Sequence, residues 1–196
     1  MMAAAGASVG KKENYYDTIA SSYNELHKNE QEKKLAIISS LIAPKSKEWM
    51  IDVGSGTGFS REFFKCRIVG VDSSKEMLSL DPGKHVNSRA EKLPFKDNSF
   101  DYCICVTALH NFDRPSWAIN EMARVCKGPA VITVLKKSPK AKKLKAMIEK
   151  RFLIEKEIAE DKDDIYLLTR LAAGGLQLAA QRRRAASRRL LAASRE

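Results

Sequence analysis

The stretch "WMIDVGSGTGFSREFF", Trp49–Phe64, decides how the rest of the chain is read. Its apolar start, which surrounds Asp52, is typical of a short buried strand, and the alternating glycines Gly54, Gly56 and Gly58 follow directly. Glycines in such a turn let the backbone approach a ligand closely, because a side chain there would collide with it. The stretch therefore predicts a nucleotide-type ligand at the end of the first strand.

Three classes of ligand compete for this turn. A triphosphate site needs G-x-x-x-x-G-K-[ST], and no lysine follows these glycines. A dinucleotide site has G-x-G-x-x-G, whereas this turn is G-x-G-x-G, and the Asp52 carboxylate would repel a diphosphate. S-adenosylmethionine fits better, since it carries an ammonium and a sulfonium and no phosphate. Asp72, at the end of the next strand, can accept both ribose hydroxyls, but NAD-binding folds share this feature.

Helical and strand periods alternate between Tyr15 and Arg170. The periods predict helices over 15–26, 29–42, 59–64, 73–80, 116–126 and 139–152, and strands over 48–53, 66–72, 85–90, 98–109, 129–135, 153–161 and 163–170. Alternation of this kind predicts an α/β fold, a Rossmann-like, doubly wound, mostly parallel sheet of seven strands whose last strand is antiparallel. Ligands of such sheets bind at the carboxyl ends of the strands, where the glycine turn lies.

Four segments of the chain together carry a family resemblance. The segments "IDVGSGTG", "VGVDSSKEML", "AEKLPFKDNSFDYCICVTALHNF" and "RVCKGPAVITV" resemble, in order and spacing, the class I S-adenosylmethionine-dependent methyltransferases. The likeness is greatest to the group that includes small-molecule and quinone-biosynthesis methyltransferases, and it covers residues 14–170. The resemblance implies S-adenosylmethionine as the cofactor.

The resemblance assigns roles to residues at matching positions. The first motif would surround the methionine part, Asp72 the ribose, and Ser73, Met77 and the Ala90–Glu91 loop the adenine. The tyrosines before it would belong to a helix that caps the cofactor, and Thr107 would face the methionine and the substrate. The cofactor-binding residues so implied are Tyr16, Tyr23, Asp52, Gly54, Ser55, Gly56, Gly58, Asp72, Ser73, Met77, Ala90, Glu91 and Thr107.

The chain departs from the family pattern at two places. Arg89 stands where relatives commonly have an acid, so the adenine amino group would need Glu91 or a backbone carbonyl instead. Little sequence is inserted after the fifth strand, so the lid over the site is expected to be small or to be completed by a partner protein. Several of these residues could instead have purely structural roles. Asp72 could cap a helix, Glu91 could belong to a solvated loop, and the tyrosines could be core residues.

His110, in "TALHNF", is the candidate catalytic residue. It follows the fourth strand beside the expected transfer site, and a neutral imidazole is a suitable general base near pH 7. Histidine is nevertheless frequent at this position in relatives without an evident catalytic role. Methyl transfer from a sulfonium depends largely on positioning of the acceptor. The absence of an Asn-Pro-Pro-aromatic run argues against amide or exocyclic nitrogen acceptors, and the absence of a Pro-Cys pair argues against attack by a cysteine.

The charge is unevenly spread along the chain. The formal net charge is +11, and residues 171–196 contain six Arg and one Glu. We expect a flexible leader over 1–12, one methyltransferase domain over 13–170, and a basic Ala/Arg-rich tail over 171–196 that is disordered or foreign to the domain. The tail could otherwise be an arm for nucleic acid or an acidic membrane surface. No apolar run approaches the roughly 20 residues of a membrane span, so we expect a cytoplasmic protein.

These observations predict an enzyme that transfers a methyl group by in-line displacement to a small-molecule acceptor. RNA, either tRNA or rRNA, is an alternative acceptor because of the lysines in "LKKSPKAKKLKAMIEK". A protein acceptor, an activating partner subunit and a non-catalytic scaffold that binds S-adenosylmethionine remain open. The four cysteines include no C-x-x-C pair, so we expect reduced core thiols rather than disulfides or zinc, and no metal ion.

Overall fold

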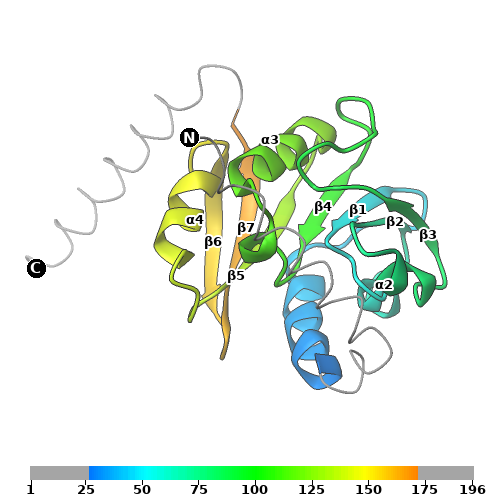
Figure 1. Ribbon diagram of the computed structural model, residues 1–196, viewed down its shortest axis with the longest axis horizontal. Coiled ribbons are helices and arrows are strands. Elements are labelled where there is room, and N and C mark those ends of the chain that lie inside the picture. Colours follow the sequence, from blue (N-terminus) through cyan, green and yellow to red (C-terminus); the bar gives the residue numbers. More distant parts are fainter. Residues whose placement is uncertain (1–26, 172–196) are drawn as a thin grey trace, which may run out of the picture.

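The computed structural model describes residues 27–171, which form one sheet with helices on both of its faces (Figure 1). Residues 27–41 are helical, and the remaining elements are β1 (Trp49–Val53), η1 (Phe59–Glu62), β2 (Arg67–Asp72), α2 (Lys75–Ser79), β3 (Lys84–Asn87), β4 (Tyr102–Cys105), η2 (Leu109–Asn111), α3 (Pro115–Val125), β5 (Ala130–Leu135), α4 (Ala141–Ile148), β6 (Phe152–Ala159) and β7 (Asp163–Arg170). The expected first helix, the leader and the tail lie outside the described residues.

The seven strands follow the order β3-β2-β1-β4-β5-β7-β6. The pairs from β3 to β5 are parallel, while β7 runs antiparallel to both β5 and β6. This arrangement confirms the predicted doubly wound sheet with an antiparallel last strand. The order reverses between β1 and β4, so the carboxyl ends of these two strands define the switch point where such sheets bind ligands.

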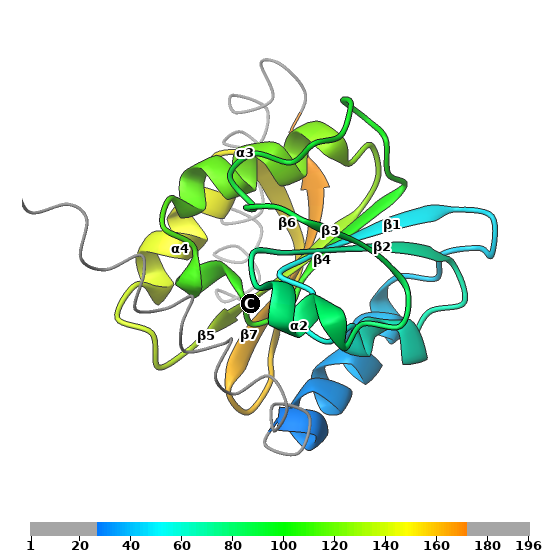
Figure 2. The ribbon, with the colours of Figure 1, turned by 45° about the vertical axis from the view of Figure 1, so that its right-hand side comes forward.

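The sheet has a core on each face because the side chains of its central strands alternate between two apolar layers. Ile51 and Val53 face the layer that α3 and α4 cover, and Met50 faces the layer under the helix of residues 27–41. Figure 2 shows α3 and α4 on one side of the strands and this blue helix on the other. Serine caps α2 as expected, since the Ser74 hydroxyl accepts the Met77 N–H at 3.1 Å.

Several predicted elements are shorter in the structure, and two of these lie beside the glycine turn or the end of β4. The helix expected over 59–64 is only the four-residue 3-10 helix η1, because four residues separate its end at Glu62 from the start of β2 at Arg67. The strand expected over 98–109 is reduced to β4, and Thr107, just beyond it, has a positive φ of 53°. Within residues 27–171, no helix has the length and apolar content that crossing a membrane requires.

Candidate cofactor site

The glycine turn after β1 brings the backbone close to its neighbours. Gly54 and Gly56 have φ values of 78° and 55°, a region that L side chains rarely adopt. A Cβ at Gly54 would lie 2.4 Å from the Ala108 Cβ, and one at Gly56 would lie 3.3 Å from the Met77 Cε. The Gly54 N–H also donates to the Val71 carbonyl at 2.7 Å. The turn therefore packs closely between the ends of β2 and β4, and side chains at these two positions would press against Ala108 and Met77.

Gly58 has a different surrounding. A Cβ at this position would lie 2.6 Å from the Asp81 Oδ1, and the Asp81 carboxylate is fully buried. Arg61 Nη2 donates to Asp81 Oδ2 at 2.8 Å. Burial raises the pKa of Asp81, but the hydrogen bonds from Arg61 and the Gly83 N–H and the nearby positive charge together lower it more, so the pKa lies below its usual value. Gly58 thus packs on an ion pair under the turn and lines neither of the cavities described next.

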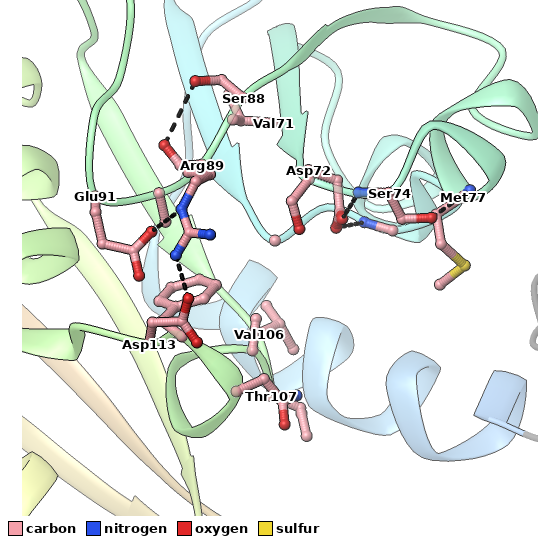
Figure 3. A pocket seen from close by; sticks show the side chains of 17 residues that line it. Val71, Asp72, Ser74, Met77, Ser88, Arg89, Glu91, Val106, Thr107 and Asp113 are labelled. Atoms are coloured by element: carbon pink, nitrogen blue, oxygen red, sulfur yellow. Dashed lines mark hydrogen bonds and ion pairs between the residues drawn. The ribbon is translucent and has the colours of Figure 1, made fainter. Parts of the chain in front are cut away.

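A larger cavity opens at the carboxyl ends of β1, β2 and β4 (Figure 3). Its wall contains most of the residues that the sequence predicted, drawn from segments up to 53 positions apart along the chain. The predicted residues in this wall are Gly54, Gly56, Asp72, Ser73, Met77, Ala90, Glu91 and Thr107.

Asp72 joins the glycine turn to the start of α2. Its Oδ2 accepts the Gly56 N–H at 2.9 Å, and its Oδ1 accepts the Ser74 N–H at 3.0 Å. Figure 3 shows this side chain on the cavity wall between Val71 and Met77. Since Ser74 is the residue that caps α2, the helix-cap interpretation of Asp72 is incomplete. A carboxylate has about four acceptor sites, so Asp72 can hold the backbone and accept further hydroxyl donors.

Three charged side chains meet on another part of the wall. Arg89 forms an ion pair with Asp113 and lies 3.5 Å from Glu91 (Figure 3). Glu91 also accepts the Arg114 N–H at 3.0 Å, which ties its loop to the start of α3. Sequence reasoning missed Asp113. This residue lies 24 positions after Arg89 in the sequence, and the fold places the two side chains in contact. An acid therefore stands in the cavity wall although Arg89 replaces the expected one.

A smaller cavity lies on the other side of the glycine turn. Gly54, Gly56 and Val106 line both cavities, while Asp52 and Ser55 line only the smaller one. The Asp52 side chain is buried and accepts the Ser60 hydroxyl at 2.6 Å. Burial raises the pKa of Asp52 to about 7, because a carboxylate without solvent disfavours its charged form. A cationic group in this cavity would stabilise the ionised form of Asp52.

A network of buried polar side chains holds Thr107 just beyond the carboxyl end of β4. Thr107 Oγ1 donates to Asp163 Oδ2 and accepts from Lys34 Nζ, both at 2.9 Å. Lys34 Nζ lies 3.2 Å from Asp163 Oδ1, and both side chains have no exposed surface. The Thr107 N–H and the Asp163 carboxylate also bond to Thr133 Oγ1, at 2.7 and 2.6 Å. These bonds fix a β-branched residue in a left-handed conformation that it rarely adopts.

The remaining predicted residues are less informative. His110 lies on η2 and is absent from the described wall of either cavity, although the next three residues line the larger one. A catalytic role for His110 stays a prediction. Tyr16 and Tyr23 lie outside the described residues.

Comparison with known proteins agrees with this geometry. The family model described as "Methyltransferase domain" matches residues 51–133, which include both the glycine turn and Thr107. The uncharacterized protein MJ1252 of Methanocaldococcus jannaschii is 35% identical over 130 residues, which cover 63% of this chain and 50% of that protein. The chain thus spans about half the length of this curated relative.

Two relatives have named activities. A phosphatidylethanolamine N-methyltransferase of Cereibacter sphaeroides is 27% identical over 153 residues, covering 65% of this chain and 75% of the relative. A demethylmenaquinone methyltransferase of Staphylococcus aureus is 32% identical over 99 residues, covering 46% and 39%.

The crystal structure of YcgJ from Bacillus subtilis superimposes with a TM-score of 0.51 at 26% identity, over 53% of this chain and 51% of that one. The name of this Bacillus subtilis protein is uncharacterized methyltransferase YcgJ, and its sequence is 33% identical to this chain over 91 residues. The domain match over residues 51–133 and these similarities together support a class I S-adenosylmethionine-dependent methyltransferase, with S-adenosylmethionine as its cofactor.

Proposed function

We propose that this protein is a methyltransferase that uses S-adenosylmethionine to methylate a small molecule by in-line displacement. The observation that carries the proposal is the pair of cavities that share Gly54 and Gly56, with a carboxylate close to the turn on each side. Asp72 stands in the wall of the larger cavity and Asp52 in that of the smaller one. This arrangement suits a ligand with a nucleoside at one end and an ammonium at the other.

The residues present fit this cofactor on shape and on charge. The turn packs its bare backbone against Ala108 and Met77, so Gly54 and Gly56 form a thin wall between the two cavities. Asp72 would accept the ribose hydroxyls, and Met77 and Ala90 would flank the adenine. Two carboxylates beside the turn would repel a diphosphate, which argues against a dinucleotide. When bound, S-adenosylmethionine supplies an electrophilic methyl group whose departure leaves a neutral thioether.

The chain's own contribution is positioning. Thr107 lines the larger cavity, the Lys34–Asp163 pair fixes its hydroxyl, and Thr133 Oγ1 accepts its backbone N–H. Rigid placement of an acceptor against the methyl donor can supply a large share of the rate of a displacement, because it removes the entropy of encounter. We assign no general base, since His110 is not among the residues that line the described cavities.

A small-molecule acceptor is supported by the two relatives with named activities, whose names give a phospholipid and a quinone as acceptors. RNA is the second candidate, and a specific observation favours it. Residues 136–151 contain eight Lys or Arg and one Glu, and α4 within this segment exposes most of its lysines. Closely spaced cations of this kind can neutralise nucleic-acid phosphates.

The test has two stages. Calorimetry with S-adenosylhomocysteine should show binding that Asp72→Ala weakens markedly, and a wild-type chain that does not bind would refute the proposal. Transfer of labelled methyl groups to small-molecule extract, tRNA and protein fractions then identifies the acceptor class. Labelling confined to the tRNA fraction would overturn the small-molecule acceptor and leave the methyltransferase activity in place.

A further inference from the structure

Gln31 is an unexplained polar residue in the wall of the smaller cavity. It lies on the helix of residues 27–41 and is only 7% exposed. The same wall contains Leu35 from the next helical turn, and Asp52 and Ser60 from the sheet side. Within residues 27–171 the Gln31 side chain has no hydrogen-bond partner in the protein, and its amide atoms keep a little exposed surface, whereas Asp52 accepts a hydrogen bond from Ser60.

An amide with so little exposed surface keeps few hydrogen bonds to water, and Gln31 gains none from the protein in return. Gln31 also occupies a position of the helix where an apolar residue would serve the core, since Leu35, Ile38 and Ile42 follow it at helical spacing and are buried. A leucine there would pack equally well. The amide is therefore better explained by a polar group that enters the cavity.

The chemistry of the cavity narrows the class of that group. A glutamine amide offers two N–H donors and a carbonyl acceptor, so it can pair with a carboxylate and an ammonium at once. The buried Asp52 carboxylate can pair only with a cation or a donor. An α-amino-acid group, with its carboxylate and its ammonium on one carbon, matches both side chains.

The position of Gln31 is fixed by its helix. Lys34, three residues further on, is fully buried and pairs with Asp163 and Thr107. This anchor sets the rotation of the helix about its axis, and Gln31 follows because residues three apart lie on the same face. The amide is thus held over the glycine turn rather than swinging toward solvent.

We propose that Gln31 binds the α-amino-acid end of the cofactor and makes the site select ligands that carry this group. The proposal rests on the proposed function, because the nucleoside end is placed beside Asp72 in the larger cavity. The two cavities share the wall formed by Gly54, Gly56 and Val106, so one ligand can extend across the turn into both.

The test compares two ligands by calorimetry on the full chain. S-adenosylhomocysteine carries the amino-acid group, and 5′-methylthioadenosine has the same nucleoside and thioether without it. Gln31→Leu should weaken binding of S-adenosylhomocysteine about tenfold, since a hydrogen bond to a charged group is lost. Binding of 5′-methylthioadenosine should stay within about twofold of wild type, because the larger cavity is unchanged. Lys33→Leu, an exposed position on the same helix, is the matched control and should change neither.

The outcomes separate the two proposals. A wild-type chain that binds neither ligand would overturn both. A wild-type chain that binds S-adenosylhomocysteine, with equal losses for both ligands in Gln31→Leu, would overturn the role of Gln31 alone. Thermal unfolding without ligand checks the fold, and Gln31→Leu should be no less stable than wild type because it removes an unpartnered amide. Gln31→Glu is the second variant. Its carboxylate would repel the carboxylate of S-adenosylhomocysteine, so this variant should weaken binding of that ligand more than Gln31→Leu does.

Discussion

Replacing Asp163 tests how strongly the buried network supports the site. Asp163→Leu would leave the Lys34 ammonium in a position with no exposed surface and would remove the acceptor of two threonine hydroxyls. Breaking a buried ion pair in this way costs about 3–5 kcal/mol, because one charge stays buried without its partner. Glu30 remains 2.5 Å from Lys34 and is 17% exposed, which places the expected cost near the lower limit, about 3 kcal/mol.

Urea denaturation measures this cost as a shift of the unfolding midpoint at constant slope. A loss of about 3 kcal/mol corresponds to a fall of roughly 6–12 °C in the melting temperature of a chain of this size. Glu157→Leu is the matched control, since Glu157 pairs with Lys145 at 2.7 Å but their side chains are 42% and 36% exposed. Such a surface pair should contribute less than about 1 kcal/mol.

The double variant Lys34→Met/Asp163→Leu completes the test. It removes both charges together, so its free energy of unfolding should exceed that of Asp163→Leu alone. The single variant Lys34→Met is measured as well. If its cost and that of Asp163→Leu sum to the cost of the double variant within about 0.5 kcal/mol, the two side chains do not interact. A cost of less than about 1 kcal/mol for Asp163→Leu would also refute the reasoning, because it would equal that of the exposed control.

Four further predictions concern cofactor binding, pH and the acceptor. Asp72→Ala should weaken the binding of S-adenosylhomocysteine, measured by calorimetry, at least tenfold, and an unchanged affinity would contradict the role of Asp72 in binding the ribose. The raised pKa of Asp52, about 7, means that folding favours its protonated form, so stability without ligand should fall between about pH 4 and pH 7 in wild type and fall less in Asp52→Asn. S-adenosylhomocysteine should bind wild type more tightly at pH 8 than at pH 6, because the ammonium needs an ionised carboxylate, and a flat profile would exclude that contact. If RNA is the acceptor, Lys137→Glu/Lys140→Glu/Lys143→Glu should abolish labelling of tRNA and leave cofactor affinity unchanged.

The parts of the site that the sequence predicted are those set by short-range pattern. The glycines and Asp52 lie in one turn, and Asp72 ends the next strand, so their meeting follows from the parallel pairing of β1 with β2. The strand order could be inferred because alternating strands and helices permit few topologies.

The parts that sequence reasoning missed depend on contacts between distant segments. Asp163 meets Thr107 across 56 positions, and Lys34 meets Thr107 across 73. A signal was nevertheless present in the helix of residues 27–41. Gln31 and Lys34 occupy the same stripe as Leu35 and Ile38, and a polar residue in an apolar stripe indicates a buried partner. The partner itself could not be named before the fold placed β7 beside β5.

The two faces of the sheet explain why these polar residues gather where they do. On the face under the helix of residues 27–41, β1 changes from Met50 to Asp52 on approaching its carboxyl end, and β5 changes from Val131 to Thr133. On the opposite face the side chains stay apolar to the ends of the strands, as Val53 and Val134 show. One face therefore supplies a rigid apolar support, while the other ends in a polar band at the switch point. Burial of that band is unfavourable unless its groups are paired, so the helix must bring a polar side chain of its own, and Lys34 meets this requirement through Asp163 and Thr107.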